Sequence, residues 1–423
     1  MHKNYVLFLA LVLFSIFGPR IHSQPLNISP IDLAALQQIK NCLIDIPSTS
    51  NSSLKFFSTW DFSSHDPCSS FAGITCSSII PRHVLTLTLG TGLSDSLGLA
   101  GSLSSAICNL TELTQLVLYT GIVTGSIPNQ LGSLNNLRVI SLTNNRLTGT
   151  IPESIFKLPN LHTLDLSHNL LSGSIPSSIS QMVQLKVLVL ASNKLTGALP
   201  SNLPAGLFHL DMKNNGFSGI LPKKLPVTLR YVSVSGNRLW GPLNGLESLS
   251  ELVYLDLSMN RLSGPIPLSL FRSNLTSMLV QRNNLSGNIP PQKITSLSYP
   301  RNLYGPGSVV DLSHNMLAGE ISGVFLGVET LFLNNNQFSG KVPKEYVRSI
   351  LNGDMKTLYL QHNYLTDFPM ESDLALPGSA SLCLSYNCMV PQVGLDPCPA
   401  SAGEQLSRPA YQCSKFNNGS SGD

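Results

Sequence analysis

Charged residues are scarce in this 423-residue chain: Asp, Glu, Lys and Arg together make up 12% of it, and aromatic residues make up 7%. The formal charge is +3, from 26 basic and 23 acidic residues. Lys3 and Arg20 lie in a segment that we expect to be removed, and without them 24 basic residues face 23 acidic ones. A nearly neutral chain lacks the basic surface of a nucleic-acid-binding protein, so we expect no nucleic-acid partner.

Motifs of catalysis are also missing. The sequence contains no nucleophile elbow, no phosphate-binding loop and no zinc-binding motif, and most of its serines belong to the turns of a repeat. We therefore predict that the chain is not an enzyme and has neither a cofactor nor a metal site.

Long apolar runs are nearly absent. One run, Tyr5 to Phe17, follows Lys3 and ends before the small residue Ser23. It is too short to cross about 30 Å of hydrocarbon, so we predict a cleaved secretory signal over residues 1–23. The tail after Ser414 is polar, and from it we expect no membrane helix, no GPI signal and no kinase domain.

A repeat of 24 residues organises the rest of the chain. Eight positions recur after 24 residues: Leu137, Ile140, Leu142, Asn145, Leu147, Gly149, Ile151 and Pro152 return as Leu161, Leu164, Leu166, Asn169, Leu171, Gly173, Ile175 and Pro176. The spacing places the second and third apolar residues on one face of a short strand and predicts a sharp turn at the Asn. One unit cannot bury its leucines alone, so the units must stack into a solenoid.

About twelve units fit this register. Their first residues are Val84, Leu113, Leu137, Leu161, Leu185, Leu207, Leu229, Leu252, Leu275, Gly307, Val328 and Met355. Each Asn is expected to be buried, with its amide bonded to the backbone of neighbouring turns. The unit at 275–306 is longer and irregular; it is either a binding loop that presents Tyr299, Arg301 and Tyr304 or a passive bulge. We expect a helical turn from Glu345 to Leu351.

The segment Leu-x-Gly-x-Ile-Pro after each Asn identifies the type of repeat. Its prolines, such as Pro152 and Pro176, favour an extended or 3₁₀-like convex side without long helices. At these residues the chain resembles plant-type extracellular leucine-rich repeat proteins, which include secreted polygalacturonase-inhibitor-like proteins and the ectodomains of receptor-like proteins and receptor kinases. The resemblance implies an α/β solenoid: a right-handed superhelix with a concave parallel β-sheet and disulfide-bonded caps.

We expect one continuous domain with two caps. The N-terminal cap covers residues 24–83, the repeat array 84–368, and the C-terminal cap with its polar tail 369–423. A capping helix is predicted from Ser29 to Leu43, with Ser29 as N-cap and Pro30 at the first helical position. Trp60 and the segment Cys68–Cys76 follow the plant cap pattern, although its adjacent cysteine pair and second Trp are absent.

All eight cysteines lie near the two ends of the chain: Cys42, Cys68, Cys76, Cys108, Cys383, Cys388, Cys398 and Cys413. An even number at each end of a secreted chain predicts two bridges per cap and argues against a metal site. Three pairings are open at either end. We favour Cys68 with Cys76, which leaves Cys42 with Cys108; that bridge would tie the capping helix to the first repeat and contribute about 4 kcal/mol.

Six sequons predict a glycoprotein: Asn27, Asn51, Asn109, Asn274, Asn284 and Asn418. One or two of these asparagines would remain unglycosylated if their side chains face inward. Asn284 is the doubtful one, because it follows the repeat residue Asn283 directly.

Stacking of the coils places equivalent residues in columns on the concave sheet. Successive residues in a column lie about 4.8 Å apart. The column before the second leucine holds His209, Tyr231 and Tyr254 on three successive coils, which predicts a rigid strip that anchors a ligand. The neighbouring column holds Arg138, His162, Lys186, Phe208 and Arg230, and further candidates are Phe332 and Tyr359. A separate column with Arg282, His314 and His362 predicts a second patch. Asp165, Asp211, Asp256 and Asp311 lie between the leucines, where they either bind a ligand or only keep the sheet soluble.

These features predict a secreted recognition protein in the extracellular space or cell wall, acting in defence or signalling. By resemblance, its partner is a peptide, a receptor-kinase ectodomain or a microbial wall-degrading enzyme. The alternative is a structural scaffold that binds wall polysaccharide through dispersed polar contacts.

Overall fold

A computed structural model describes residues 27–46, 55–90, 98–272, 274–291, 304–370, 376–389, 398 and 407–419. The expected signal segment, Asn51, Tyr299 and Arg301 lie outside the described residues, as does the side chain of Asn418. None of the helices within the described ranges is long and apolar enough to cross a membrane.

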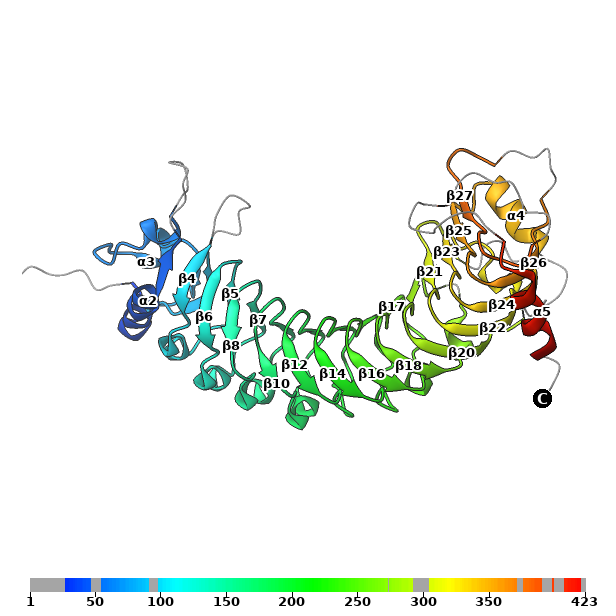
Figure 1. Cartoon of the computed structure of the whole chain (residues 1–423). Helices are drawn as coiled ribbons and strands as arrows, with labels where there is room; N and C mark the ends of the chain where they lie inside the picture. Colours follow the sequence, from blue (N-terminus) through cyan, green and yellow to red (C-terminus); the bar gives the residue numbers. More distant parts are fainter. Residues whose placement is uncertain are drawn as a thin grey trace, which may run out of the picture.

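The chain forms an arc, and a fourteen-stranded sheet lines its concave side (Figure 1). The first strand of this sheet pairs antiparallel with the second, and all later neighbours pair in parallel, one strand per coil. The strands are β2 (Ile74–Cys76), β3 (Val84–Leu89), β5 (Gln115–Leu118), β7 (Val139–Leu142), β9 (Thr163–Asp165), β11 (Val187–Val189), β13 (His209–Asp211), β15 (Tyr231–Ser233), β17 (Tyr254–Asp256), β19 (Ser277–Leu279), β21 (Val309–Asp311), β23 (Thr330–Phe332), β25 (Thr357–Tyr359) and β27 (Ser381–Cys383).

Strand β27 extends the array beyond the twelve predicted units. It pairs with β25 and lies within the segment expected to be the C-terminal cap, and Asn387 occupies the Asn position of this extra coil. The repeat geometry therefore continues past residue 368, and the cap is built onto a thirteenth coil rather than beside the array.

The Leu-x-Gly segments, expected only to be extended, form two further sheets along the flank of the arc. The four-stranded sheet contains β1 (Leu43–Asp45), β4 (Leu99–Ser102), β6 (Ile122–Ser126) and β8 (Arg146–Thr148). The nine-stranded sheet contains β10 (Ser172–Gly173), β12 (Lys194–Gly197), β14 (Gly216–Gly219), β16 (Arg238–Gly241), β18 (Arg261–Gly264), β20 (Asn284–Asn288), β22 (Met316–Glu320), β24 (Gln337–Lys341) and β26 (Tyr364–Asp367).

The convex side consists mainly of short 3₁₀ helices, as the prolines predict. These are η1 (Phe56–Thr59) in the N-terminal cap, then η2 (Ser105–Asn109), η3 (Asn129–Ser133), η4 (Glu153–Lys157), η5 (Ser177–Gln181), η6 (Asn244–Leu246), η7 (Leu268–Leu270) and η8 (Gly323–Phe325). The α-helices are α2 (Pro30–Cys42), α3 (Pro67–Ser70), α4 (Lys344–Leu351) and α5 (Ala410–Gly419). Helix α4 confirms the helical turn expected in the last long unit.

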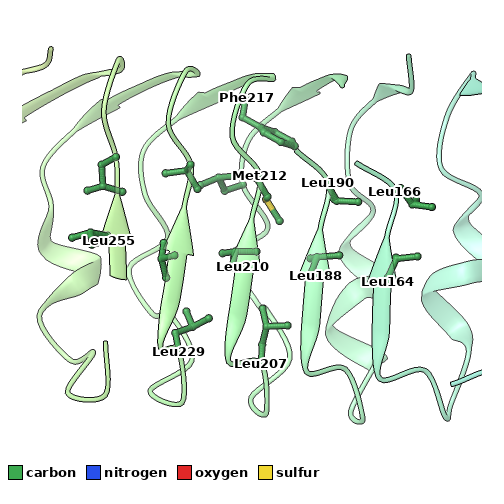
Figure 2. Close-up of a cluster of buried hydrophobic side chains, with 14 of the residues drawn as sticks. Leu164, Leu166, Leu188, Leu190, Leu207, Leu210, Met212, Phe217, Leu229 and Leu255 are labelled. Atoms are coloured by element: carbon green, nitrogen blue, oxygen red, sulfur yellow. The ribbon is translucent and has the colours of Figure 1, made fainter. Parts of the chain in front are cut away.

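The core lies between the concave strands and the convex segments. The second and third apolar residues of each unit are fully buried, and Figure 2 shows them repeated side by side in neighbouring coils. Tyr304 belongs to this core, with 1% of its surface exposed, and burial raises its pKa to about 12. Of the two alternatives for the irregular unit, presentation of Tyr304 by a binding loop is not observed, because Tyr304 is buried where the end of this unit joins the array.

The repeated asparagines bind backbone groups of adjacent coils, as predicted. The Asn169 side chain accepts a hydrogen bond from the Leu147 N–H at 3.0 Å and donates to the Leu142 carbonyl at 2.7 Å. These residues range from buried to half-buried. The residue before each Asn has a positive φ, for example 52° at Asn144 and 56° at His168. The Asn side chain satisfies peptide groups that this tight turn leaves without ladder partners.

Helix α2 covers the open end of the first coil. Ser29 is the N-cap residue and Pro30 the first helical position, as predicted, but the Ser29 hydroxyl makes no capping hydrogen bond. Asp32 docks the helix instead: it is 1% exposed, and its carboxylate accepts a hydrogen bond from the Val84 N–H at 2.8 Å and lies 3.2 Å from Nδ1 of His83. Trp60 stacks on Phe71 below this helix, with ring centroids 5.2 Å apart.

Three disulfides close the caps: Cys68–Cys76, Cys383–Cys398 and Cys388–Cys413. The favoured pair Cys68–Cys76 is therefore present. Cys42 and Cys108 carry free thiols, so the predicted bridge between them is wrong. Both residues lie on elements that pack together, α2 and η2, but a disulfide needs a narrow range of Cβ positions as well as proximity.

Candidate binding site on the concave sheet

Three aromatic side chains stack on successive strands of the concave sheet. Strand register places His209 beside Tyr231 and Tyr231 beside Tyr254. The His209 and Tyr231 ring centroids are 4.1 Å apart, the Tyr231 and Tyr254 centroids are 4.4 Å apart, and each pair of ring planes is tilted by only 3°. The predicted strip is thus a continuous stack across β13, β15 and β17, and we call these three residues the aromatic stack.

The aromatic stack is half-buried, so each ring keeps an exposed part on the concave face. Burial lowers the pKa of His209, although the carboxylates of Asp211 and Asp165 act in the opposite direction. Burial raises the pKa of both tyrosines, and nearby carboxylates add to this shift. At neutral pH the stack therefore presents uncharged rings with polar edges, which suits contact with an amphipathic ligand.

Buried carboxylates lie directly beside the rings. Asp211 is 6% exposed and Asp256 is 9% exposed. The Asp256 carboxylate accepts hydrogen bonds from the N–H and the hydroxyl of Ser258, at 3.1 and 2.7 Å, and Asp165 binds Ser167 in the same manner. These aspartates therefore stabilise the turn that follows each strand, a role that sequence analysis missed although the Asp-x-Ser pattern signals it.

Asp211 differs from the other aspartates because a cation faces it. Its carboxylate lies 3.3 Å from Nζ of Lys213 and also accepts a hydrogen bond from the Lys213 N–H at 3.1 Å. The buried polar groups beside the aromatic stack are therefore the ion pair of Asp211 with Lys213 and the carboxylate of Asp256, which accepts hydrogen bonds from Ser258.

The neighbouring column is continuous, as predicted. Backbone hydrogen bonds link Arg138, His162, Lys186, Phe208 and Arg230 in that order. Phe208 is 43% exposed, and its ring meets His209 edge-on with centroids 6.5 Å apart. Arg230 is 3.6 Å from Glu251 in an exposed ion pair. Phe208 and Arg230 therefore border the aromatic stack, whereas Arg138 and Lys186 lie on earlier coils.

The remaining candidates lie on later coils. Phe332 and Tyr359 meet edge to face with centroids 5.1 Å apart, in the column of the aspartates rather than that of the aromatic stack. Arg282 belongs to a separate column with His314 and His362, which begins on the coil directly after that of Tyr254.

Two of the sequons sit on exposed positions away from the concave columns. Asn109 ends η2, and Asn284 begins β20 on the flank of the arc; both side chains are exposed. Asn274 is exposed and Asn27 is half-buried. The inward orientation considered for Asn284 is therefore not observed, and its glycosylation stays a prediction.

Within the described residues, no group of three His, Cys, Asp or Glu side chains is placed to hold a metal ion. The concave site contains the stacked rings, the buried carboxylates of Asp211 and Asp256, and the exposed guanidinium of Arg230.

Family models for the leucine-rich repeat match residues 135–195 and 251–273, and a model for the leucine-rich repeat N-terminal domain matches residues 29–77. The chain is a leucine-rich repeat protein. Solved structures of the same fold include two receptors. A search of curated proteins finds no match.

This leucine-rich repeat protein is similar to a plant peptide hormone receptor, RGFR1, solved in complex with RGF2: the TM-score is 0.52, the identity 29%, and the alignment covers 69% of this chain and 54% of the receptor chain. A TDR receptor gives a TM-score of 0.59 at 24% identity, with the same coverages of 69% and 54%. The chain thus spans about half the length of both receptor chains. A plant ice-binding protein gives 0.56 at 23% identity, covering 81% of this chain and 97% of that protein.

Proposed function

We propose that this leucine-rich repeat protein is a secreted recognition protein that binds an extracellular peptide or protein through its concave face. The observation that carries the proposal is the aromatic stack, in which His209, Tyr231 and Tyr254 hold parallel rings 4.1 and 4.4 Å apart on three adjacent strands. The stacked rings already restrain one another, so little side-chain freedom is lost when a ligand covers them.

The environment of the stack supports a polypeptide ligand. Tyr and His combine apolar faces with polar edges, and tyrosine is enriched among residues that dominate binding energy. The exposed ring of Phe208 and the guanidinium of Arg230 extend this surface with one apolar and one cationic contact. The similarity at 29% identity to a receptor solved with a peptide hormone points in the same direction. Disulfide-bonded caps are typical of proteins that function outside the cytosol.

The test is capture of extracellular proteins from plant tissue by the mature chain, followed by titration of the retained partner against purified variants. Tyr231→Ala with Tyr254→Ala removes two rings of the stack. The matched control is Phe332→Ala with Tyr359→Ala, which removes an aromatic pair from the same sheet on later coils. We expect the first double variant to weaken binding by at least about thirtyfold, the size of one hot-spot loss, and the control to bind like the wild type.

Two results would count against the proposal. Equal affinity of both double variants for the partner would place the binding surface elsewhere. Salt-sensitive retention of wall polysaccharide by wild type and both variants alike, with no retained protein, would favour a structural scaffold.

A further inference from the structure

We propose that the C-terminal part of the array carries a second binding site, a cationic stripe that takes an acidic peptide segment and binds it more tightly as the pH falls from neutral to about 5. The stripe consists of Arg282, His314, Asn335, His362 and Tyr386. It begins on the coil directly after that of Tyr254 and extends away from the aromatic stack, and its proposal does not depend on that stack.

The fold aligns these five side chains. Each occupies the position directly before the repeated Asn of its coil, where φ lies between 54° and 58°. The N–H of Arg282, His314, Asn335 and His362 each donates to a carbonyl of the next coil, to Ser313, Asn334, Gln361 and Ser385 at 2.9 to 3.0 Å. Five consecutive coils therefore present one side chain each in a single row. Four coil steps of about 4.8 Å give the row a length on the order of 19 Å, enough for about six extended residues.

Contacts within the stripe join neighbouring side chains. Nδ2 of Asn335 lies 3.4 Å from Nε2 of His314, and the His362 and Tyr386 rings have centroids 5.0 Å apart. Beyond the row, the Arg408 guanidinium lies 4.6 Å from the Tyr386 ring and donates a hydrogen bond from Nε to the Asn363 carbonyl at 2.9 Å. Arg408 thus adds a fixed cation at the C-terminal end.

The stripe contains one arginine and two histidines and no carboxylate. Among the described residues, no ion pair involves Arg282, His314 or His362. The earlier coils fill the same column differently, with Asn144, His168, Ser192, Asn214, Gly236 and Met259. Arg282 and two of the three histidines of this column therefore lie at its C-terminal end, and an anionic ligand is the complement of this charge pattern.

Burial and three ionisable groups act on His314. Burial and the charges of Arg282 and His362 lower its pKa, whereas the carboxylate of Asp311 acts in the opposite direction. Burial raises the pKa of Asp311 itself, although it accepts a hydrogen bond from the Ser313 N–H at 2.9 Å. Acidification therefore favours the protonated form of His314 and reduces the charge of the Asp311 carboxylate. Both changes make the stripe more positive.

A peptide fits the surroundings better than a bare polyuronate. The Phe332 and Tyr359 rings lie on the coils of Asn335 and His362, in the concave-sheet column that also contains the aspartates. Because the two rings pack edge to face, they present ring edges rather than a flat surface for stacking. Such a surface favours a chain that alternates acidic and apolar side chains.

The direct test measures binding of fluorescein-labelled heptaaspartate to the full mature chain at pH 7.5 and pH 5.0 and constant ionic strength. Aspartate stays largely ionised at pH 5.0, because its usual pKa is about 3.9. Heptaasparagine is the uncharged control peptide. We expect heptaaspartate to bind at least about tenfold more tightly at pH 5.0 than at pH 7.5, a change that corresponds to about 1.4 kcal/mol.

The informative variant is His314→Asn with His362→Asn. Asn tolerates a positive φ and already occupies this position in other coils, for example at Asn144 and Asn214, so the fold is retained. The control is His168→Asn, an exposed histidine at the same position outside the stripe. We expect the double variant to lose the pH dependence and the control to keep it. Tyr231→Ala with Tyr254→Ala should leave this binding unchanged, which separates it from the proposed function.

Three outcomes would overturn the inference: equal affinity of the wild type for heptaaspartate at both pH values, the same pH dependence in His314→Asn/His362→Asn, or pH-dependent binding of oligogalacturonate without binding of heptaaspartate. The last of these would assign the stripe to a polysaccharide instead of a peptide.

Discussion

Tyr231 and Tyr254 face each other across adjacent parallel strands with ring centroids 4.4 Å apart and ring planes tilted by 3°. Their backbones are aligned residue by residue, so the ring spacing follows the spacing of strands in a sheet. His209 continues the same stack at 4.1 Å. The periodicity of the coil, rather than a special loop, therefore creates the surface to which we assign ligand binding.

His209 makes stability depend on pH in a defined direction. Burial lowers its pKa in the folded protein below that of an unfolded chain, about 6.5. The unfolded state therefore binds protons more strongly, and stability present above pH 6.5 is lost as the pH falls. We expect the melting temperature to fall between pH 7.5 and pH 5.0, and to fall less in His209→Gln. An identical fall in the variant would show that His209 does not titrate with unfolding.

Asn169 should contribute strongly to stability. Replacement by Ala leaves the buried Leu147 N–H without its acceptor and removes the donor to the Leu142 carbonyl. Each unsatisfied buried group costs about 1–3 kcal/mol, so we expect a loss of about 3 kcal/mol or more in the free energy of unfolding. Chemical denaturation measures it. Asn135→Ala, at an exposed position two units earlier, is the control and should change stability by less than about 0.5 kcal/mol.

Asp32 should hold the N-terminal cap on the array. In Asp32→Ala the Val84 N–H loses its acceptor and His83 loses its partner. We expect a destabilisation of about 2 kcal/mol, with faster hydrogen exchange in α2 and β3. Glu153→Ala breaks only an exposed pair with Lys157 and should have almost no effect. Unchanged exchange in α2 would show that apolar contacts alone dock the helix.

Counting the free thiols tests the disulfide connectivity of the N-terminal cap. Mass spectrometry after alkylation of the denatured, unreduced protein should find two free thiols, those of Cys42 and Cys108. In the native protein Cys108 should react slowly at pH 8, because burial raises its pKa to about 11 and the thiolate is the reactive form. Detection of no free thiol would mean that a fourth bridge forms after all.

The sequence predicts the parts of this molecule that repeat. The Leu-x-x-Leu-x-Leu-x-x-Asn spacing predicted the coil, the buried asparagines and the column of His209, Tyr231 and Tyr254, because one register applies to all units. Features that depend on a single local conformation were not predicted. Tyr304 turns into the core at the end of an irregular unit, and Cys42 stays unpaired beside η2, because neither follows from a repeat spacing.

The strands of the flank were missed for a different reason. The Leu-x-Gly segment is too short to show a strand pattern within one unit, and it becomes a sheet only when neighbouring coils pair. Pairing between neighbouring coils also extends the array to β27, where Asn387 makes the same backbone hydrogen bonds as the earlier asparagines.

The most direct test of the central claim is hydrogen exchange of the protein with and without its captured partner. We predict protection in the segments that contain β13, β15 and β17, near residues 207–213, 229–235 and 252–258, with little change in the flank strands of the same coils. Protection confined to the flank or the convex 3₁₀ helices would contradict the assignment of ligand binding to the aromatic stack.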